Sequence, residues 1–250
     1  MIAFISDIHS NTEALTACLE EIDRLGCSRI VCLGDIIGYG PEPRATLKAV
    51  MERAEFSLLG NHEHGAMFYA SDFNPRARAA IDWTRDQLNR RDAAREENMR
   101  LWNYLDAMPQ EHREGDLLLV HGSPRDPVRE YIVPRDGEDR VKMAECFARM
   151  GDARLCFVGH SHVPGVYPEA GGFKSPADVG GEFAADGRAI VNIGSVGQPR
   201  DGDPRASFAT YENGAVRFHR VEYDFRATMA KIRAIPELPG YLADRLEQGR

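Results

Sequence analysis

The chain has 250 residues and a net charge of -8, with 43% hydrophobic and 28% charged residues. This composition is typical of a globular enzyme, and the length favours one domain over residues 1–250, near the upper limit for a single hydrophobic core. The acidic excess argues against an extended nucleic-acid surface, because such surfaces neutralise phosphates with lysine and arginine. A local cationic pocket is compatible with this charge.

The cysteines and the start of the chain bear on its compartment. Five cysteines are scattered without a C-x-x-C pair: Cys18, Cys27, Cys32, Cys146 and Cys156. This pattern favours reduced, mostly buried thiols over a disulfide framework or a cysteine-based zinc site. Residues 1–7 hold too few apolar positions for a signal-peptide core, and no apolar run reaches the length of a membrane span. We therefore expect a cytoplasmic protein without a membrane partner.

The first third of the chain alternates apolar runs with helical periodicity. Three runs predict buried strands: residues 2–5, 29–33 and 56–59. Between them, Ser10 and Glu13 form an S-x-x-E capping box for a helix that Gly26 is placed to end, and Pro43 opens a second helix. This rhythm of strands and helices predicts a parallel sheet covered by helices.

The rest of the chain begins with a helical segment and continues into a second half that is rich in predicted strands. Residues 75–108 predict one or two helices that form an insertion or cap. Further strands are expected over 116–122, 154–160 and 188–194, and further helices over 138–150, 225–234 and 238–248. Asn213 and Gly214 predict the turn of a hairpin, and 171–187 is expected to be an exposed loop or short hairpin.

Side chains that bind metals follow five of the predicted strands. They are Asp7 and His9, then Asp35, then Asn61 and His62, then His121, and finally His160 and His162. Ligands bind at the carboxyl ends of strands in α/β sheets, so five segments deliver donors to one edge. Five of the eight histidines occupy these positions, which separate structural roles do not explain.

The chemistry of these donors constrains the ion and the reaction. Carboxylates, an amide oxygen and imidazoles, without a thiolate, favour Mn²⁺, Fe, Zn²⁺, Ni²⁺ or Co²⁺ over Mg²⁺ or Ca²⁺. There are too many donors for one tetrahedral ion, and a bridging carboxylate would let two ions share them. Two ions about 4 Å apart can hold a hydroxide and clamp a phosphoryl group for in-line displacement. We therefore expect two divalent metal ions and hydrolysis of phosphate esters.

The order of these motifs resembles that of the calcineurin-like metallophosphoesterase superfamily. The blocks are SDIHSN, LGDIIGYGP, LGNHEHG, VHGSP and VGHSHVP, and the set spans residues 4–164. The later stretch IVNIGSVGQPRDGDPRASFATY is similar to the bacterial branch of small phosphodiesterases and diadenosine tetraphosphate hydrolases. The resemblance implies a four-layer α/β/β/α sandwich of two mixed β-sheets flanked by helices.

The resemblance also implies roles for the donors. Asp7, His9 and His162 would hold the first ion, Asn61, His121 and His160 the second, and Asp35 would bridge. His62 is then the general acid for the leaving-group oxygen or a hydrogen-bond donor to a phosphate oxygen. The implied reaction is attack of a metal-bridging hydroxide on a phosphodiester or phosphomonoester. A specific nucleotide hydrolase, such as a diadenosine polyphosphate hydrolase, is the alternative, and a non-catalytic scaffold of the same fold is a third.

Departures from the family pattern narrow the activity. Gly38 and Tyr39 stand where the protein phosphatase branch has an aspartate, which pairs with the catalytic histidine, and an arginine. This argues against a Ser/Thr protein phosphatase. Glu63 stands where small phosphodiesterases more often have aspartate, and it either orients His62 or is solvated.

Several further residues have a functional and a structural interpretation. Asn11 either orients a ligand or touches the substrate, or it opens the first helix. The loop QPRDGDPRAS supplies Arg200 and Arg205, and Arg200 either clamps a phosphate or pairs with an aspartate that follows it. Tyr39 and Tyr131 either stack on a base or pack. The expected substrate is a small phosphorylated compound or nucleotide, while its identity, the native metals and the oligomeric state stay open.

Overall fold

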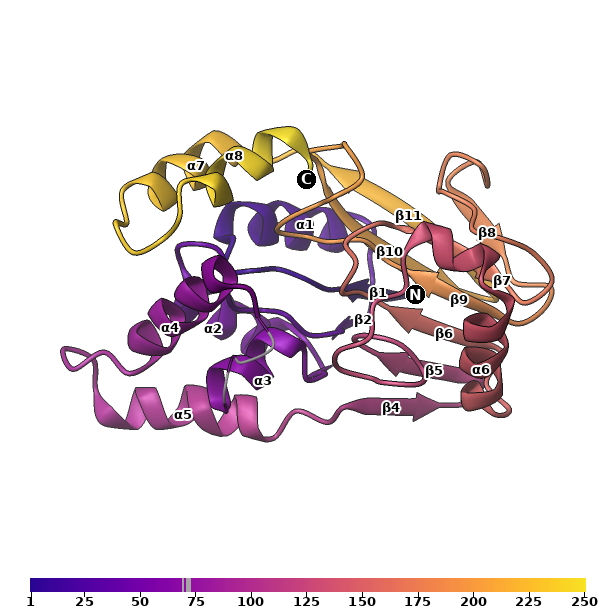
Figure 1. Ribbon diagram of the computed structural model, residues 1–250, viewed down its shortest axis with the longest axis horizontal. Coiled ribbons are helices and arrows are strands. Elements are labelled where there is room, and N and C mark those ends of the chain that lie inside the picture. The colour runs from indigo at the N-terminus through magenta and orange to yellow at the C-terminus, as the bar shows by residue number, and fades with distance from the viewer. Residues whose placement is uncertain (69, 71–72) are drawn as a thin grey trace.

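The computed structural model describes residues 1–68, 70 and 73–250 (Figure 1). Its strands form a six-stranded sheet in the order β3-β2-β1-β10-β11-β8 and a five-stranded sheet in the order β4-β5-β6-β9-β7. The strands are β1 (Ile2–Ile5), β2 (Arg29–Cys32), β3 (Phe56–Ser57), β4 (Glu111–Glu114), β5 (Leu117–Val120), β6 (Leu155–Val158), β7 (Gly165–Pro168), β8 (Glu182–Ala184), β9 (Ala189–Asn192), β10 (Ala206–Glu212) and β11 (Ala215–Val221). The helices are α1 (Thr12–Arg24), α2 (Pro43–Arg53), α3 (Asn61–Met67), α4 (Pro75–Leu88), α5 (Arg95–Asp106), α6 (Arg140–Met150), α7 (Phe225–Arg233) and α8 (Tyr241–Gln248), with a short 3₁₀ turn over Pro134–Glu138.

The two sheets pack face to face and carry helices on their outer sides. Strands β1, β2 and β3 are parallel to one another, as are β5, β6 and β9. Between the sheets lies an apolar core in which the rings of Phe4 and Phe157 stack with 4.2 Å between their centroids. Residues of α1 and α2 pack on the outer face of the six-stranded sheet, and those of α6 on the other sheet. This arrangement confirms the predicted four-layer sandwich.

The first helix begins one residue later than its capping box predicts. Ser10 has a left-handed backbone with a φ of 55°, whereas Asn11 is extended and its side chain accepts a hydrogen bond from the Ala14 amide. Asparagine is among the best N-cap residues, so Asn11 takes the place predicted for Ser10. The helix ends as predicted, because Gly26 follows it with a φ of 70°.

Other differences arise where apolar patterning is weak. The sequence did not predict β4, which is mostly exposed and polar at the edge of its sheet, or β7, which contains a glycine and a proline. The segment 171–187 contributes an edge strand, β8, which pairs with β11. The Asn213-Gly214 hairpin is confirmed, with both φ angles positive as a two-residue turn requires. Among the described residues, no helix is both long and apolar enough to cross a bilayer.

Candidate metal centre

The carboxyl ends of parallel strands from both sheets meet at one edge of the sandwich. All eight side chains predicted for the centre come together there: Asp7, His9, Asp35, Asn61, His62, His121, His160 and His162. Within the described residues, three overlapping groups of buried donors, each with its ligand atoms within 4.8 Å of one another, are candidate metal sites: Asp7-His9-His162, His9-Asp35-His62 and Asp35-His121-His160.

The backbone at these positions is strained. Five of the donors have positive φ angles: Asp7 (53°), His9 (49°), Asp35 (53°), His160 (64°) and His162 (61°). A left-handed conformation costs a non-glycine residue about 1–2 kcal/mol. Neighbouring loops hold it in place, since the Asp7 amide donates to Gly34 O and the His9 amide to Asp35 O, each at 3.0 Å. Glycine at position 34 lets this loop also lie close to the one that carries Asn61, because a Cβ there would lie 2.7 Å from the Gly60 nitrogen.

Backbone carbonyl groups fix the orientation of four imidazoles. The contacts are His9 Nδ1 to Ile37 O (3.2 Å), His121 Nδ1 to Leu33 O (2.9 Å), His160 Nε2 to Arg129 O (3.0 Å) and His162 Nδ1 to Gln198 O (2.5 Å). A carbonyl oxygen only accepts hydrogen bonds, so each of these nitrogens carries the proton. The other nitrogen of each ring therefore points inward, and it presents a lone pair wherever the ring is neutral.

These inward nitrogens face one another and two carboxylates. His9 Nε2 lies 3.1 Å from His162 Nε2, and His121 Nε2 lies 3.1 Å from His160 Nδ1. Asp7 Oδ1 is 3.1 Å from His162 Nε2 and 3.9 Å from His9 Nε2. Lone pairs of neutral rings and carboxylates repel at such distances unless positive charge lies among them, which is the environment of a metal ion.

Asp35 joins the two halves of this cluster. Its Oδ2 is 3.7 Å from His9 Nε2 and 3.4 Å from His121 Nε2, and Asn61 Oδ1 is 3.1 Å from the same His121 nitrogen. Burial works to raise the pKa of the Asp35 carboxyl, but His121 and His62 hold it well below its usual range. Burial likewise lowers the pKa of His121, yet Asp35 and Asp7 outweigh it and raise the value to about 9. The buried carboxylates therefore draw positive charge to this point.

His62 lies at the start of α3, above the donors. Its amide donates to Asp35 Oδ1 at 2.9 Å, and its ring packs edge-on against Tyr39 and His9, with 4.3 Å and 4.7 Å between centroids. Its Nδ1 is buried without a hydrogen-bond partner among the described residues. A Cβ at Gly38 would lie 2.1 Å from that nitrogen, so the ring occupies the space that a side chain at position 38 would need. Burial lowers the pKa of His62 to about 4, which leaves the imidazole neutral at pH 7.

Glu63 is fully buried, which corrects the expectation of a solvated side chain. Its carboxylate accepts from four backbone amides: Gly60 (3.0 Å) and Asp35 (2.8 Å) at Oε2, and Ile36 (2.8 Å) and Ile37 (3.1 Å) at Oε1. In the described chain it thus binds backbone amides rather than the His62 ring. Burial raises its pKa to about 7, and the nearby Asp35 carboxylate adds to the rise. Glu63 fastens the loop that carries Asp35 to the start of α3.

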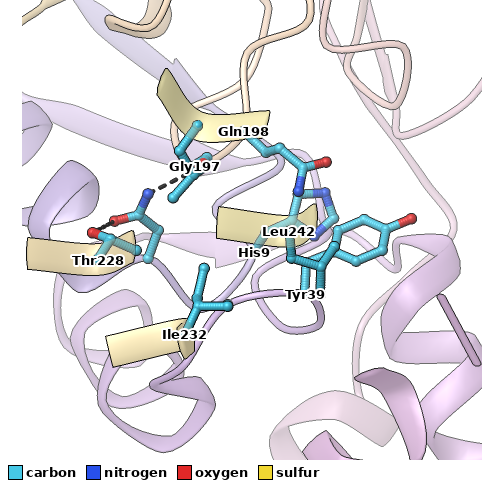
Figure 2. A pocket seen from close by; sticks show the side chains of 10 residues that line it. His9, Tyr39, Gly197, Gln198, Thr228, Ile232 and Leu242 are labelled. Atoms are coloured by element: carbon cyan, nitrogen blue, oxygen red, sulfur yellow. Dashed lines mark hydrogen bonds between the residues drawn. The ribbon is translucent and has the colours of Figure 1, made fainter. Parts of the chain in front are cut away.

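Asn11 caps the first helix and joins it to two neighbouring segments. Its Oδ1 accepts from the Ala14 amide (3.1 Å) and Thr228 Oγ1 (3.0 Å), and its Nδ2 donates to Gly197 O (2.9 Å) and Tyr223 Oη (3.3 Å). The dashed lines in Figure 2 mark the contacts at Gly197 and Thr228, beside a cavity of about 10 Å³ that His9 and Tyr39 also line. These contacts use both amide hydrogens of Asn11 and hold its side chain in place.

Arg200 lies beside the centre rather than in a surface ion pair. Its guanidinium is 5.9 Å from the centroid of the Tyr39 ring, and its Nη2 donates to Gln198 Oε1 at 2.8 Å. Its Nε is buried and has no partner among the described residues. The two aspartates that follow it pair with other arginines: Asp201 with Arg220, and Asp203 with the exposed Arg205. The expected alternative, pairing of Arg200 with one of these aspartates, was wrong.

Comparisons with known proteins agree with this geometry. The family model of the calcineurin-like phosphoesterase superfamily domain matches residues 1–214. The uncharacterized protein MJ0912 of Methanocaldococcus jannaschii is 36% identical over 261 residues, which cover 100% of this chain and 98% of that protein. The crystal structure of a metallophosphoesterase from Sphaerobacter thermophilus is 40% identical and has a TM-score of 0.82, over 100% of this chain and 98% of the other. The hypothetical protein PH1004 from Pyrococcus horikoshii OT3 shares the fold at 21% identity and a TM-score of 0.77, over 100% and 99% of the two chains.

Proposed function

The chain belongs to the calcineurin-like phosphoesterase superfamily and is a hydrolase of phosphoric esters, and from this premise we propose that it cleaves phosphodiester or phosphomonoester bonds with two divalent cations. One observation carries the proposal. Four imidazoles, each with one nitrogen held by a carbonyl, turn the other nitrogen toward two buried carboxylates. Such a set of acceptors favours cations at its centre.

The donors divide into two sets that share one carboxylate. Asp7, His9 and His162 would hold one ion, Asn61, His121 and His160 the other, and Asp35 would contact both. Nitrogen and oxygen donors without thiolate suit Mn²⁺, Fe, Zn²⁺, Ni²⁺ or Co²⁺. Bound cations supply charge that neutralises the phosphoryl oxygens and activates the attacking water.

The chain's own side chains would bind and orient the ester. Arg200, whose Nε has no partner among the described residues, is placed to donate to phosphate oxygens. The neutral His62 imidazole carries one N–H, which it would donate to a phosphate oxygen or to the leaving-group oxygen. Tyr39 packs between these two groups and orients them.

Removal of metal tests the proposal directly. Protein treated with a chelator is expected to lose hydrolysis of bis(p-nitrophenyl) phosphate by at least about 100-fold, since the electrostatic stabilisation of the phosphoryl group is lost. Mn²⁺ or another of the suited ions should restore it, with close to two ions per chain by elemental analysis. Full activity in protein verified as metal-free would contradict the proposal.

Replacing His62 separates proton donation from metal binding. His62→Ala is expected to retain both ions and lower kcat by about 10²–10³-fold, the usual effect of removing one hydrogen-bond donor from developing charge. His62→Gln keeps an N–H donor but cannot transfer a proton, so partial recovery in this variant would indicate a hydrogen-bonding role. Elemental analysis and steady-state kinetics provide both readouts, and wild-type turnover in His62→Ala would exclude either role.

We further propose that residues 1–250 act as one domain in the cytoplasm. Residues of α7 and α8, which lie beyond residue 214, support the single domain, because Ile232 and Leu242 line the same cavity as His9 and Tyr39 (Figure 2). All five cysteines are free thiols, and four of them are buried, which suits a reducing compartment.

A further inference from the structure

A pocket of about 180 Å³ opens directly beside the candidate metal centre. Asn61 and His160 of the donor set line it, together with Tyr39, Tyr131 and Arg129. Its volume is below the roughly 300 Å³ at which pockets for whole drug-sized ligands begin, so it suits a single ring system. Because Asn61 and His160 line it, the pocket adjoins the position at which the phosphoester would be cleaved.

Tyr131 places a partly exposed aromatic ring at this pocket. One face of its ring stacks on His160, with 3.6 Å between centroids and 20° between planes. The residue is nevertheless 44% exposed, so packing against the protein covers only part of it. An exposed aromatic ring beside a reactive centre is a typical platform for a planar ligand group.

The segment that carries Tyr131 is fixed by polar contacts. Lys142 Nζ donates to the Tyr131 carbonyl oxygen at 2.6 Å. Glu130, the preceding residue, accepts from Arg125 Nε at 3.0 Å and from Ser123 Oγ at 2.5 Å. Because the ring is held before any ligand arrives, binding would cost little ordering of this segment.

Two arginines lie at or next to this pocket. Arg129 lines it, and the Arg200 guanidinium lies 5.9 Å from the ring centroid of Tyr39, another lining residue. Burial raises the pKa of Tyr131, and the positive charge of Arg200 works against that rise. A ligand with an anionic group next to an aromatic group would match these arginines and the Tyr131 ring.

We propose that the natural substrate carries a planar aromatic group, such as a nucleobase, which stacks on the outward face of Tyr131 while its phosphoester lies at the donor cluster. The inference rests on the proposed function, because the phosphoester must occupy the centre for its aromatic group to reach Tyr131. It narrows the substrate class to aromatic phosphoesters of the nucleotide type.

Calorimetric titration of manganese-loaded protein tests the proposal with two ligands that differ only in the base. The 5′-phosphonate analogues of AMP and of ribose 5-phosphate contain a carbon–phosphorus bond that a phosphoesterase does not cleave. We expect the adenosine analogue to bind about 5- to 150-fold more tightly, the range that stacking of a base on an aromatic side chain provides. In Tyr131→Ala this affinity ratio should fall toward one, and in Tyr131→Phe it should persist.

Control arms separate this inference from the proposed function. Met99→Ala removes a residue of similar exposure, 46%, on α5 and should keep the wild-type affinity ratio. Equal affinities for the two analogues in the wild type, binding of neither, or an unchanged ratio in Tyr131→Ala would overturn the inference. Inorganic phosphate tests the centre itself: its failure to bind to manganese-loaded protein would count against the proposed function, whereas phosphate binding without preference for the base would count only against the aromatic substrate.

Discussion

Replacing Glu63 with alanine is expected to lower the free energy of unfolding by about 4 kcal/mol or more, because each buried donor left without a partner costs about 1–3 kcal/mol. The carboxylate accepts from four amides and is fully buried, so in the alanine variant water would not readily replace it as the hydrogen-bond acceptor. Urea denaturation of the wild type and the variant, followed by circular dichroism, measures the change.

Two further variants show whether the hydrogen bonds are the cause. Glu20→Ala removes an exposed glutamate of α1 and should change stability by no more than about 0.5 kcal/mol. Glu63→Gln keeps one oxygen acceptor and should lie between the wild type and the alanine variant. A Glu63→Ala protein as stable as Glu20→Ala would mean that the four amides find other partners.

Asp35→Ala is expected to lower kcat/KM by about 10³-fold or more, since a central electrostatic element of the site is lost. Asp35 lies within 3.7 Å of a histidine of each donor set, so metal content should also fall below two ions per chain. Kinetics and elemental analysis on the same preparation measure both quantities.

The Asp35→Asn variant separates charge from local structure. An asparagine oxygen can still accept from the His62 amide, which Asp35 Oδ1 binds at 2.9 Å, so the start of α3 should be preserved. We expect this variant to fold with wild-type stability while its activity falls with its metal content. Wild-type turnover with two bound ions in Asp35→Asn would contradict a charge-based role for this residue.

The sequence predicted the donors because each follows a short apolar strand, and such strands bring their carboxyl ends to one edge. The same signal located β1, β2, β5, β6 and β9. It failed for β4, whose side chains are mostly exposed and polar, because an edge strand without apolar residues shows no alternation of apolar and polar positions. The role of Glu63 was also missed, since three of its four partners are backbone amides from a loop 26 to 28 residues away in sequence.

Interactions through the backbone were likewise outside what the sequence could predict. The carbonyl groups of Arg129 and Gln198 orient His160 and His162, yet neither contact depends on the identity of the side chain that supplies it. The start of α1 shows a related limit. A serine and an asparagine in succession are both good caps, and only the conformation of the preceding loop selects Asn11.

The left-handed backbone at five donors has a consequence for related sequences. Glycine adopts such angles without strain, so at these positions it would relieve the local backbone cost while removing a donor. The local backbone conformation alone therefore does not account for Asp or His at these positions. A homologous chain with glycine at two or more of them would lack donors of the centre, and we expect it to have lost the reaction.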